Sequence, residues 1–187
     1  MYIYYFLNTY FMKTIGEKFP DFTKEALVSL KMDKEFKTLT QEDMVGKWTV
    51  FFWWPMDFTF ICPTEIISFN DHFDDFAQRD ANLIGASTDS QYVHLAWRNS
   101  HPGLLSLKFH MLADTSKSLA EELGILEPDN KIAYRATYII DPEGTIQHVS
   151  INGLNVGRNV KETIRILDAL QTGELTPCAW VPGEDTL

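Results

Sequence analysis

Short apolar runs alternate with amphipathic segments along most of the chain. The run from Trp48 to Trp54, WTVFFWW, is continuously apolar and rich in aromatic and β-branched side chains. Such a run predicts a strand that is buried on both faces. Pro55 ends it, because proline cannot donate to a sheet ladder. A second apolar run, residues 81–86 (ANLIGA), predicts another buried strand.

Helices are predicted between and after these strands. The first follows Cys62, where Pro63 suits a helix's first turn because its missing N–H costs nothing there. Its apolar side chains recur at near-helical spacing: Ile66, Ile67, Phe69, Phe73 and Phe76. Three further helices are predicted, at residues 90–99 with Asp89 or Ser90 as N-cap, 116–123 ending at Gly124, and 159–171 stopped by Gly173.

The remaining strands complete a mixed sheet. Residues 109–112 predict a short strand, and residues 133–141 and 145–151 predict a hairpin turning at Pro142-Glu143-Gly144. Alternating strands and helices imply a parallel core, to which the hairpin adds an antiparallel edge. The expected fold is therefore α/β, a mixed central sheet flanked by helices. Its predicted domain spans residues 12–173, between an N-terminal extension (1–11) and a C-terminal tail (174–187).

Composition narrows the function. The formal net charge of −10 argues against nucleic-acid binding, because an acidic chain repels phosphate backbones. Residues 1–11, MYIYYFLNTYF, are apolar but shorter than the roughly 20 residues of a membrane span. They also lack the positive start and cleavage site of a secretory signal. We expect no membrane association and a cytoplasmic location.

The chain has only two cysteines, Cys62 and Cys178, which are 178 − 62 = 116 positions apart. A disulfide scaffold would use more cysteines, and a structural zinc site would cluster them. The five histidines show no metal-ligand spacing and are interpreted as structural or surface residues: His72, His94, His101, His110 and His148. No metal or other cofactor is expected. The cysteine count alone is compatible either with redox chemistry or with two inert buried thiols.

Cys62 lies where a buried strand has ended and a helix is about to begin. Unpaired N–H groups and the positive dipole end of a helix favour an ionised thiolate, so the position favours a nucleophile. Pro55, Thr59 and Cys62 form P-x-x-x-T-x-x-C, which strongly resembles the active-site motif of peroxiredoxins. The run FFWWPMDFTFICPTEI is most similar to the branch containing bacterial alkyl hydroperoxide reductase C. The resemblance extends over residues 15–187.

The resemblance implies a thioredoxin-like fold and a thiol-dependent peroxidase. Cys62 would attack hydrogen peroxide or an organic hydroperoxide, Thr59 would hydrogen-bond the sulfur and the peroxide, and Pro55 would shield the pocket. The family's catalytic arginine matches Arg135 in the segment IAYRAT. Three supporting residues also match family positions: Glu65, which would hold the arginines, Arg158 in NVGR, and Trp97 in HLAW.

The sulfenic acid formed at Cys62 must condense with a second thiol to be recycled. The resemblance implies that this second thiol is Cys178 of the partner subunit in a homodimer. It also implies that the dimers assemble into a ring such as a decamer. A thioredoxin-like or other dithiol protein would then reduce the disulfide. The usual resolving position, four residues before Trp180, is occupied by Thr176 here. A one-cysteine enzyme that uses an external thiol therefore stays an alternative.

The sequence argues against two other functions. A thiol–disulfide oxidoreductase would carry Cys-x-x-Cys, but Glu65 stands where its second cysteine belongs. A non-catalytic assembly module or holdase would not need the set of Thr59, Cys62 and Arg135. Peroxide-sensitive eukaryotic family members carry a Gly-Gly-Leu-Gly loop and a C-terminal Tyr-Phe helix, whereas residues 101–104 here are HPGL and the given sequence stops at Leu187. Resistance to overoxidation is therefore expected.

Overall fold

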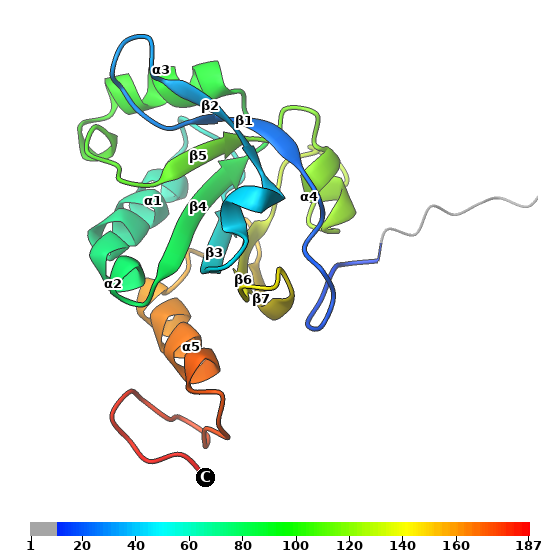
Figure 1. The fold of residues 1–187 in the computed structure, drawn as a ribbon. Helices are drawn as coiled ribbons and strands as arrows, with labels where there is room; N and C mark the ends of the chain where they lie inside the picture. The colour runs from blue at the N-terminus through cyan, green and yellow to red at the C-terminus, as the bar shows by residue number, and fades with distance from the viewer. Residues whose placement is uncertain (1–10) are drawn as a thin grey trace, which may run out of the picture.

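The computed structural model describes residues 11–187, which form a seven-stranded mixed sheet in the order β2-β1-β5-β4-β3-β6-β7. The strands are β1 (Thr23–Leu27), β2 (Phe36–Thr40), β3 (Trp48–Trp53), β4 (Ala81–Ser87), β5 (His110–Ala113), β6 (Arg135–Ile140) and β7 (Ile146–Asn152). The helices are α1 (Ile61–Asp71), α2 (Phe73–Gln78), α3 (Gln91–Ser100), α4 (Ser118–Glu122) and α5 (Val160–Thr172). Two 3-10 turns, η1 (Gln41–Met44) and η2 (Pro102–Leu104), complete the elements. Figure 1 shows the sheet between its helices, with the C-terminal tail beyond α5.

The predicted mixed sheet is confirmed in its central strands. Strand β3 pairs in parallel with β4 on one side and antiparallel with β6 on the other. The side chains of β3 are buried on both faces, as its apolar run predicts: Phe51 and Trp53 join one core cluster, and Val50 and Phe52 join the other. This alternation places the C-terminal end of β3 deep inside the molecule, where the next segment must turn.

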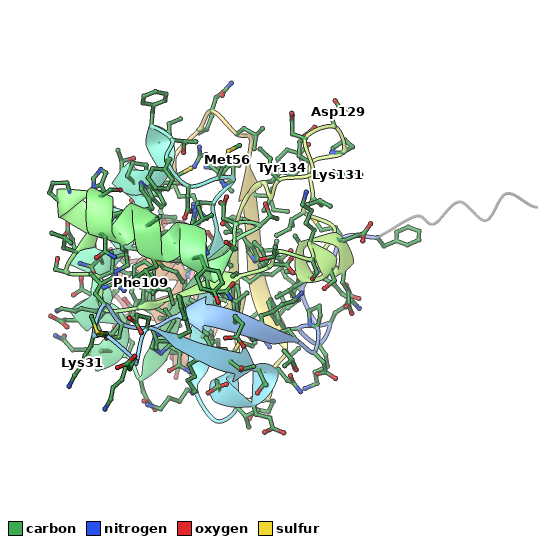
Figure 2. The ribbon with its side chains drawn as sticks, turned by 90° about the horizontal axis from the view of Figure 1, so that it is seen from above. Lys31, Met56, Phe109, Asp129, Lys131 and Tyr134 are labelled. Carbon is green, nitrogen blue, oxygen red and sulfur yellow. The ribbon has the colours of Figure 1, made fainter. Side chains whose placement is uncertain are left out.

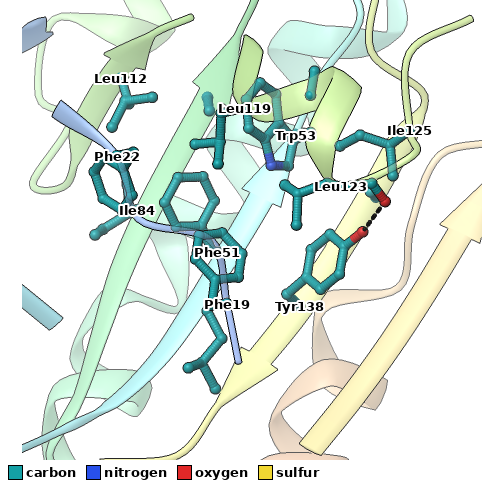
Figure 3. Close-up of a cluster of buried hydrophobic side chains, with 14 of the residues drawn as sticks. Phe19, Phe22, Phe51, Trp53, Ile84, Leu112, Leu119, Leu123, Ile125 and Tyr138 are labelled. Carbon is teal, nitrogen blue, oxygen red and sulfur yellow. Dashed lines mark hydrogen bonds between the residues drawn. The ribbon is translucent and has the colours of Figure 1, made fainter. Parts of the chain in front are cut away.

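The two core clusters lie on opposite faces of the sheet. The first packs α4 and the N-terminal segment against β3 and β6 (Figure 3). In it the Tyr138 hydroxyl donates to the Leu123 carbonyl over 3.4 Å, and burial raises the pKa of that phenol. The second cluster packs side chains of α1, α2, α3 and α5 against the sheet and contains the Cys62 sulfur. The candidate nucleophile is thus part of a packed core.

Several helix ends follow the sequence. The Ser90 side chain caps α3 by accepting from the Val93 N–H over 3.3 Å, and Asn159 caps α5 in the same way from the Lys161 N–H over 3.1 Å. Gly173 follows α5 with a φ of +68°, a left-handed conformation that glycine adopts without strain. These caps fix where α3 and α5 begin and where α5 stops.

Other elements differ from the expectation. Strands β1 and β2 were not predicted, because their sequences, TKEAL and FKTLT, are short and half polar. The helix after Cys62 breaks at His72 into α1 and α2. The expected N-terminal extension, residues 1–11, lies outside the described residues except for the exposed Phe11. The division into residues 12–173 and a tail of residues 174–187 stays a prediction.

Candidate active site

Cys62 lies in the first turn of α1, with 1% of its surface exposed. Strand β3 ends at Trp53, and residues 54–60 form the loop that leads into the helix. Pro63 occupies the same turn without cost, because the first N–H groups of a helix have no intrahelical partner. Cys62 was expected just before the helix, and the structure makes it the second residue of α1, within the turn whose N–H groups have no intrahelical partner.

Arg135 is the first residue of β6 and reaches Cys62 from the neighbouring strand. Its Nη1 donates to the Cys62 Sγ over 3.4 Å and to the Glu65 Oε2 over 2.5 Å, while its Nε donates to the Leu154 carbonyl over 2.8 Å. Only 4% of Arg135 is exposed. Two oxygen acceptors, on Leu154 and Glu65, thus hold a buried guanidinium against the sulfur.

Glu65 joins Arg135 to Arg158. Both carboxylate oxygens accept from Arg158, Oε1 from its Nε over 2.8 Å and Oε2 from its Nη2 over 2.9 Å. Arg158 also donates from Nη1 to the Ala136 carbonyl over 2.8 Å, and its guanidinium lies 5.3 Å from the centre of the Phe52 ring. Burial lowers the pKa of Arg158, and the charge of Glu65 opposes that shift.

The charges of this cluster balance when Cys62 is ionised. Two guanidinium groups and the one Glu65 carboxylate leave a single positive charge in a buried space. A thiolate at Cys62, in contact with the Arg135 Nη1, would neutralise it. A buried charge is costly unless it is paired, so a negative group in contact with the Arg135 guanidinium is stabilised here.

A small cavity of about 230 Å³ opens beside the sulfur. Its wall includes Pro55 and Thr59 from the loop, Cys62 from α1 and Arg135 from β6. The Thr59 hydroxyl donates to the Met56 carbonyl over 2.9 Å, so its oxygen lone pairs are left as acceptors. The sequence predicts that this hydroxyl bonds the sulfur, whereas in the structure it donates its hydrogen bond to the loop backbone. In Figure 2 Met56 and Tyr134, the residue before Arg135, appear at the same end of the molecule.

Comparisons with known proteins agree with this geometry. Residues 15–149 match the model of the AhpC/TSA family. Alkyl hydroperoxide reductase C of Mycobacterium tuberculosis is 44% identical over 182 residues, which cover 93% of each chain. Peroxiredoxin-2 of Mus musculus is 44% identical over 180 residues, 92% of this chain and 89% of the relative. The reduced 2-Cys peroxiredoxin of Plasmodium vivax superposes with a TM-score of 0.85 at 35% identity, over 92% and 91% of the two chains. The chain belongs to the AhpC/TSA family.

Family membership confirms two expectations from the sequence. The fold is thioredoxin-like, and the enzyme class is that of a peroxiredoxin, a thiol-dependent peroxidase. The fold also explains how site residues that lie far apart in the sequence come together in space. The end of β3, the start of α1 and the start of β6 meet because β3 and β6 are neighbours in the sheet.

Trp97, predicted as a supporting residue, lies in α3. Its ring is 2% exposed and belongs to the same core cluster as the Cys62 sulfur. The centre of the Phe58 ring, in the loop before Cys62, lies 6.0 Å from the Trp97 ring. Trp97 therefore packs beneath the active-site loop, close to the place at which the family resemblance puts it.

Cys178 is not brought to Cys62 within the chain. Both cysteines are free thiols, Cys62 buried and Cys178 exposed. Cys178 lines a hollow between the tail and the later turns of α5, together with Ile166 and Ala169. The tail is fastened there because Arg165 donates to the Trp180 carbonyl over 2.9 Å. Helix α5 separates this region from Arg158, which lies just before its first turn.

The sequence analysis missed one pair of buried polar residues in the active-site loop. Asp57 lies between Pro55 and Thr59, and its carboxylate contacts His94 of α3 over 2.7 Å. His94 had been placed among structural or surface histidines, and Asp57 had been given no role. The only available signal was the position of Asp57 inside the Pro55–Thr59–Cys62 motif.

Among residues 11–187, no group of three or more His, Cys, Asp or Glu side chains is arranged to hold a metal ion. Within the same described part, no helix is long and apolar enough to cross a membrane.

Proposed function

We propose that Cys62 reduces hydrogen peroxide and organic hydroperoxides. Its thiolate attacks one peroxide oxygen, the S–O bond forms as the O–O bond breaks, and the departing oxygen leaves as water or an alcohol after taking a proton. Cys62 becomes a sulfenic acid. The observation that carries this proposal is the contact between the Arg135 Nη1 and the buried Cys62 Sγ, which lie 3.4 Å apart at the wall of an open cavity.

The neighbouring side chains have separate roles in this reaction. Arg135 stabilises the thiolate and the charge that develops on the oxygens, because a fixed donor is most effective in a site that excludes water. Thr59 accepts a hydrogen bond from the hydroperoxide O–H, since its own O–H donates to the Met56 carbonyl. Pro55 is buried and closes the cavity wall. Glu65, Arg158 and Trp97 hold these groups in place.

Cys178 of the partner subunit resolves the sulfenic acid. Its thiol condenses with Cys62 to a disulfide and releases water, and a thioredoxin-like or other dithiol protein then reduces the disulfide. Cys178 is exposed and lies beside α5, away from Cys62 of the same chain. This supports a reaction of Cys178 with the sulfenic acid of the partner subunit. Thr176, at the usual resolving position, cannot form a disulfide.

The protein works as a homodimer assembled into a ring of dimers in the cytoplasm. Two features of the surface support assembly. Among the described residues 11–187, the outer edge of β7 has no neighbouring strand in the sheet, so it can meet a second copy. Three apolar side chains of the active-site loop, Met56, Phe58 and Phe60, are 43%, 57% and 93% exposed. Clustered exposed apolar groups mark contact surfaces.

A single-turnover measurement tests the proposed chemistry without any reductant. Reduced protein is mixed with a small excess of hydrogen peroxide, and the peroxide that remains is measured. The wild type and Cys178→Ser should both consume about one equivalent per chain, since the first step needs only Cys62. Cys62→Ser should consume none. Consumption by Cys62→Ser equal to that of the wild type would remove Cys62 from the mechanism.

A further inference from the structure

Asp57 is the one buried polar side chain of the loop that carries Pro55 and Thr59. It is 3% exposed, whereas its neighbours Met56 and Phe58 point outward. A carboxyl group is buried only where other groups bind it, because an unpaired charge in the interior is costly. The contacts of Asp57 therefore show what holds the loop to the body of the protein.

Three contacts hold Asp57. The Trp54 indole Nε1 donates to its Oδ1 over 2.7 Å, and the His94 Nδ1 lies 2.7 Å from its Oδ2. The Asp57 backbone N–H donates to the Asp89 Oδ2 over 2.9 Å. His94 is itself fully buried in α3. The middle of the loop is thus tied to the loop's own first residue, to the segment after β4 and to α3.

The protons of the pair can be assigned from its neighbours. The His94 Nε2 faces the Leu112 carbonyl oxygen at 3.3 Å, and a carbonyl only accepts, so Nε2 carries a proton. A second proton must lie between the His94 Nδ1 and the Asp57 Oδ2. The pair is therefore neutral as a whole, wherever that proton resides. Burial raises the pKa of Asp57, and its bond to His94 opposes the shift.

The next residue shows why the loop needs this anchor. Phe58 has a φ of +56°, a left-handed conformation that residues other than glycine rarely adopt. Phe58 can keep it only if its surroundings over-determine the loop. Asp57 on one side is bonded to His94, and on the other side the Thr59 hydroxyl is bonded to Met56. The ring of Phe58 adds a contact to Trp97, one helical turn after His94.

We propose that Asp57 and His94 are positioning residues for the peroxidase reaction, a pair that fixes the active-site loop so that Pro55 and Thr59 face Cys62. The inference rests on the proposed function, and it adds to that function two residues that touch neither the sulfur nor the cavity. Without the pair, Phe58 relaxes to an ordinary conformation and Thr59, the next residue, moves with it.

The test measures the second-order rate constant for oxidation of reduced Cys62 by hydrogen peroxide. Asp57→Ala should lower it about 100-fold, because a displacement of about 1 Å can cost that much. His94→Ala should lower it comparably, and the double variant no further, since the two residues act as one unit. Asp57→Asn should restore a rate close to that of the wild type. Its amide can accept from Trp54 and donate to a neutral His94 that still donates to Leu112.

Asp114→Asn is the matched control. Asp114 is also a fully buried aspartate, but it accepts from the Ala120 N–H over 2.9 Å and pairs with Lys24 over 2.6 Å, away from the loop. It should lower the melting temperature and leave the rate constant unchanged. If Asp57→Ala does not fold, His94→Ala and Asp57→Asn carry the same comparison.

The outcomes separate the two proposals. A wild type that does not react with peroxide overturns the proposed function. A wild type that reacts, with Asp57→Ala and His94→Ala equally fast, overturns only the positioning role. The role is also overturned if Asp57→Asn is as slow as Asp57→Ala, because the hydrogen-bond geometry would then not be what matters.

Discussion

One nitrogen of the Arg135 guanidinium, Nη1, donates both to the Cys62 sulfur and to the Glu65 carboxylate. The shared nitrogen ties the reactive sulfur to a network that also contains Arg158, and the whole network is buried. Under the proposed function this network holds the reduced sulfur for attack on peroxide, and its residues can be tested one at a time.

Arg135→Ala should slow oxidation of Cys62 by peroxide about 100- to 1,000-fold, the cost of removing one well-placed donor to a developing negative charge. Glu65 keeps Arg158 as a partner in this variant, so the fold should survive. Stopped-flow mixing of reduced protein with hydrogen peroxide gives the rate constant. Arg79→Ala, which removes an ion pair with Asp168 between α2 and α5, is the control and should react at the wild-type rate. A fast Arg135→Ala variant would contradict the assigned role.

Glu65→Gln should lower the free energy of unfolding strongly. It removes the one carboxylate that both buried guanidinium groups share, and breaking a buried pair from one side costs about 3–5 kcal/mol. Unfolding in guanidinium chloride gives the free energy of unfolding. Glu162→Gln, which breaks an exposed pair with Arg165, should cost at most about 1 kcal/mol. Equal losses in the two variants would show that Glu65 is not the anchor of the arginines.

The central elements could be predicted because their patterns are strong. The apolar run of β3 predicts a buried strand, and the amphipathic spacing of α5 predicts a helix with one buried face. Local caps such as Ser90 set where helices begin. Strands β1 and β2 could not be predicted. Half of their side chains face solvent, and their pairing with each other and with β5 is a tertiary property that five-residue windows do not carry.

The part of the site that a local sequence motif contains could be predicted. Pro55, Thr59 and Cys62 lie within eight positions and line one cavity, and Arg135 reaches the sulfur as the resemblance implied. Asp57 and His94 could not be paired in advance, because only the packing of α3 against the loop brings them together across 37 positions. The bond of Thr59 to Met56 likewise depends on the loop's exact backbone path.

His110 should make stability fall in mild acid. Burial lowers its pKa, with the charge of Lys37 acting in the same direction, and its Nδ1 has no hydrogen-bond partner in the described structure. Above the ordinary histidine pKa of about 6.5, the folded and unfolded states both hold the neutral ring, and the contribution is fully present. As the pH falls further, the unfolded state takes up a proton that the folded state resists, so the free energy of unfolding decreases.

His110→Phe removes this linkage. Its free energy of unfolding should fall less steeply than that of the wild type between about pH 7 and about pH 5, measured by urea unfolding at each pH. Carboxylates contribute to both proteins alike, so the difference between the two curves isolates the histidine. Identical pH dependence in the two proteins would show that His110 titrates freely when folded.

The protein should resist overoxidation of Cys62. The first turn of α1 has no side-chain cap, and Phe60 just before it is 93% exposed, so this turn can unwind at little cost and release the sulfenic acid. Rapid disulfide formation then competes with a second peroxide. Intact-mass measurement during a peroxide titration should show slow gain of a second oxygen on the wild type and faster gain on Cys178→Ser. Equally rapid overoxidation of both would contradict this expectation.

The most direct test of the account is a non-reducing gel of reduced protein after about one equivalent of hydrogen peroxide. The account predicts a band at about twice the chain mass of 21.5 kDa, reversed by dithiothreitol. That band should be absent from Cys62→Ser and from Cys178→Ser, because one cysteine comes from each subunit. Monomer alone in the oxidised wild type would contradict the pairing of Cys62 with Cys178 of the partner subunit.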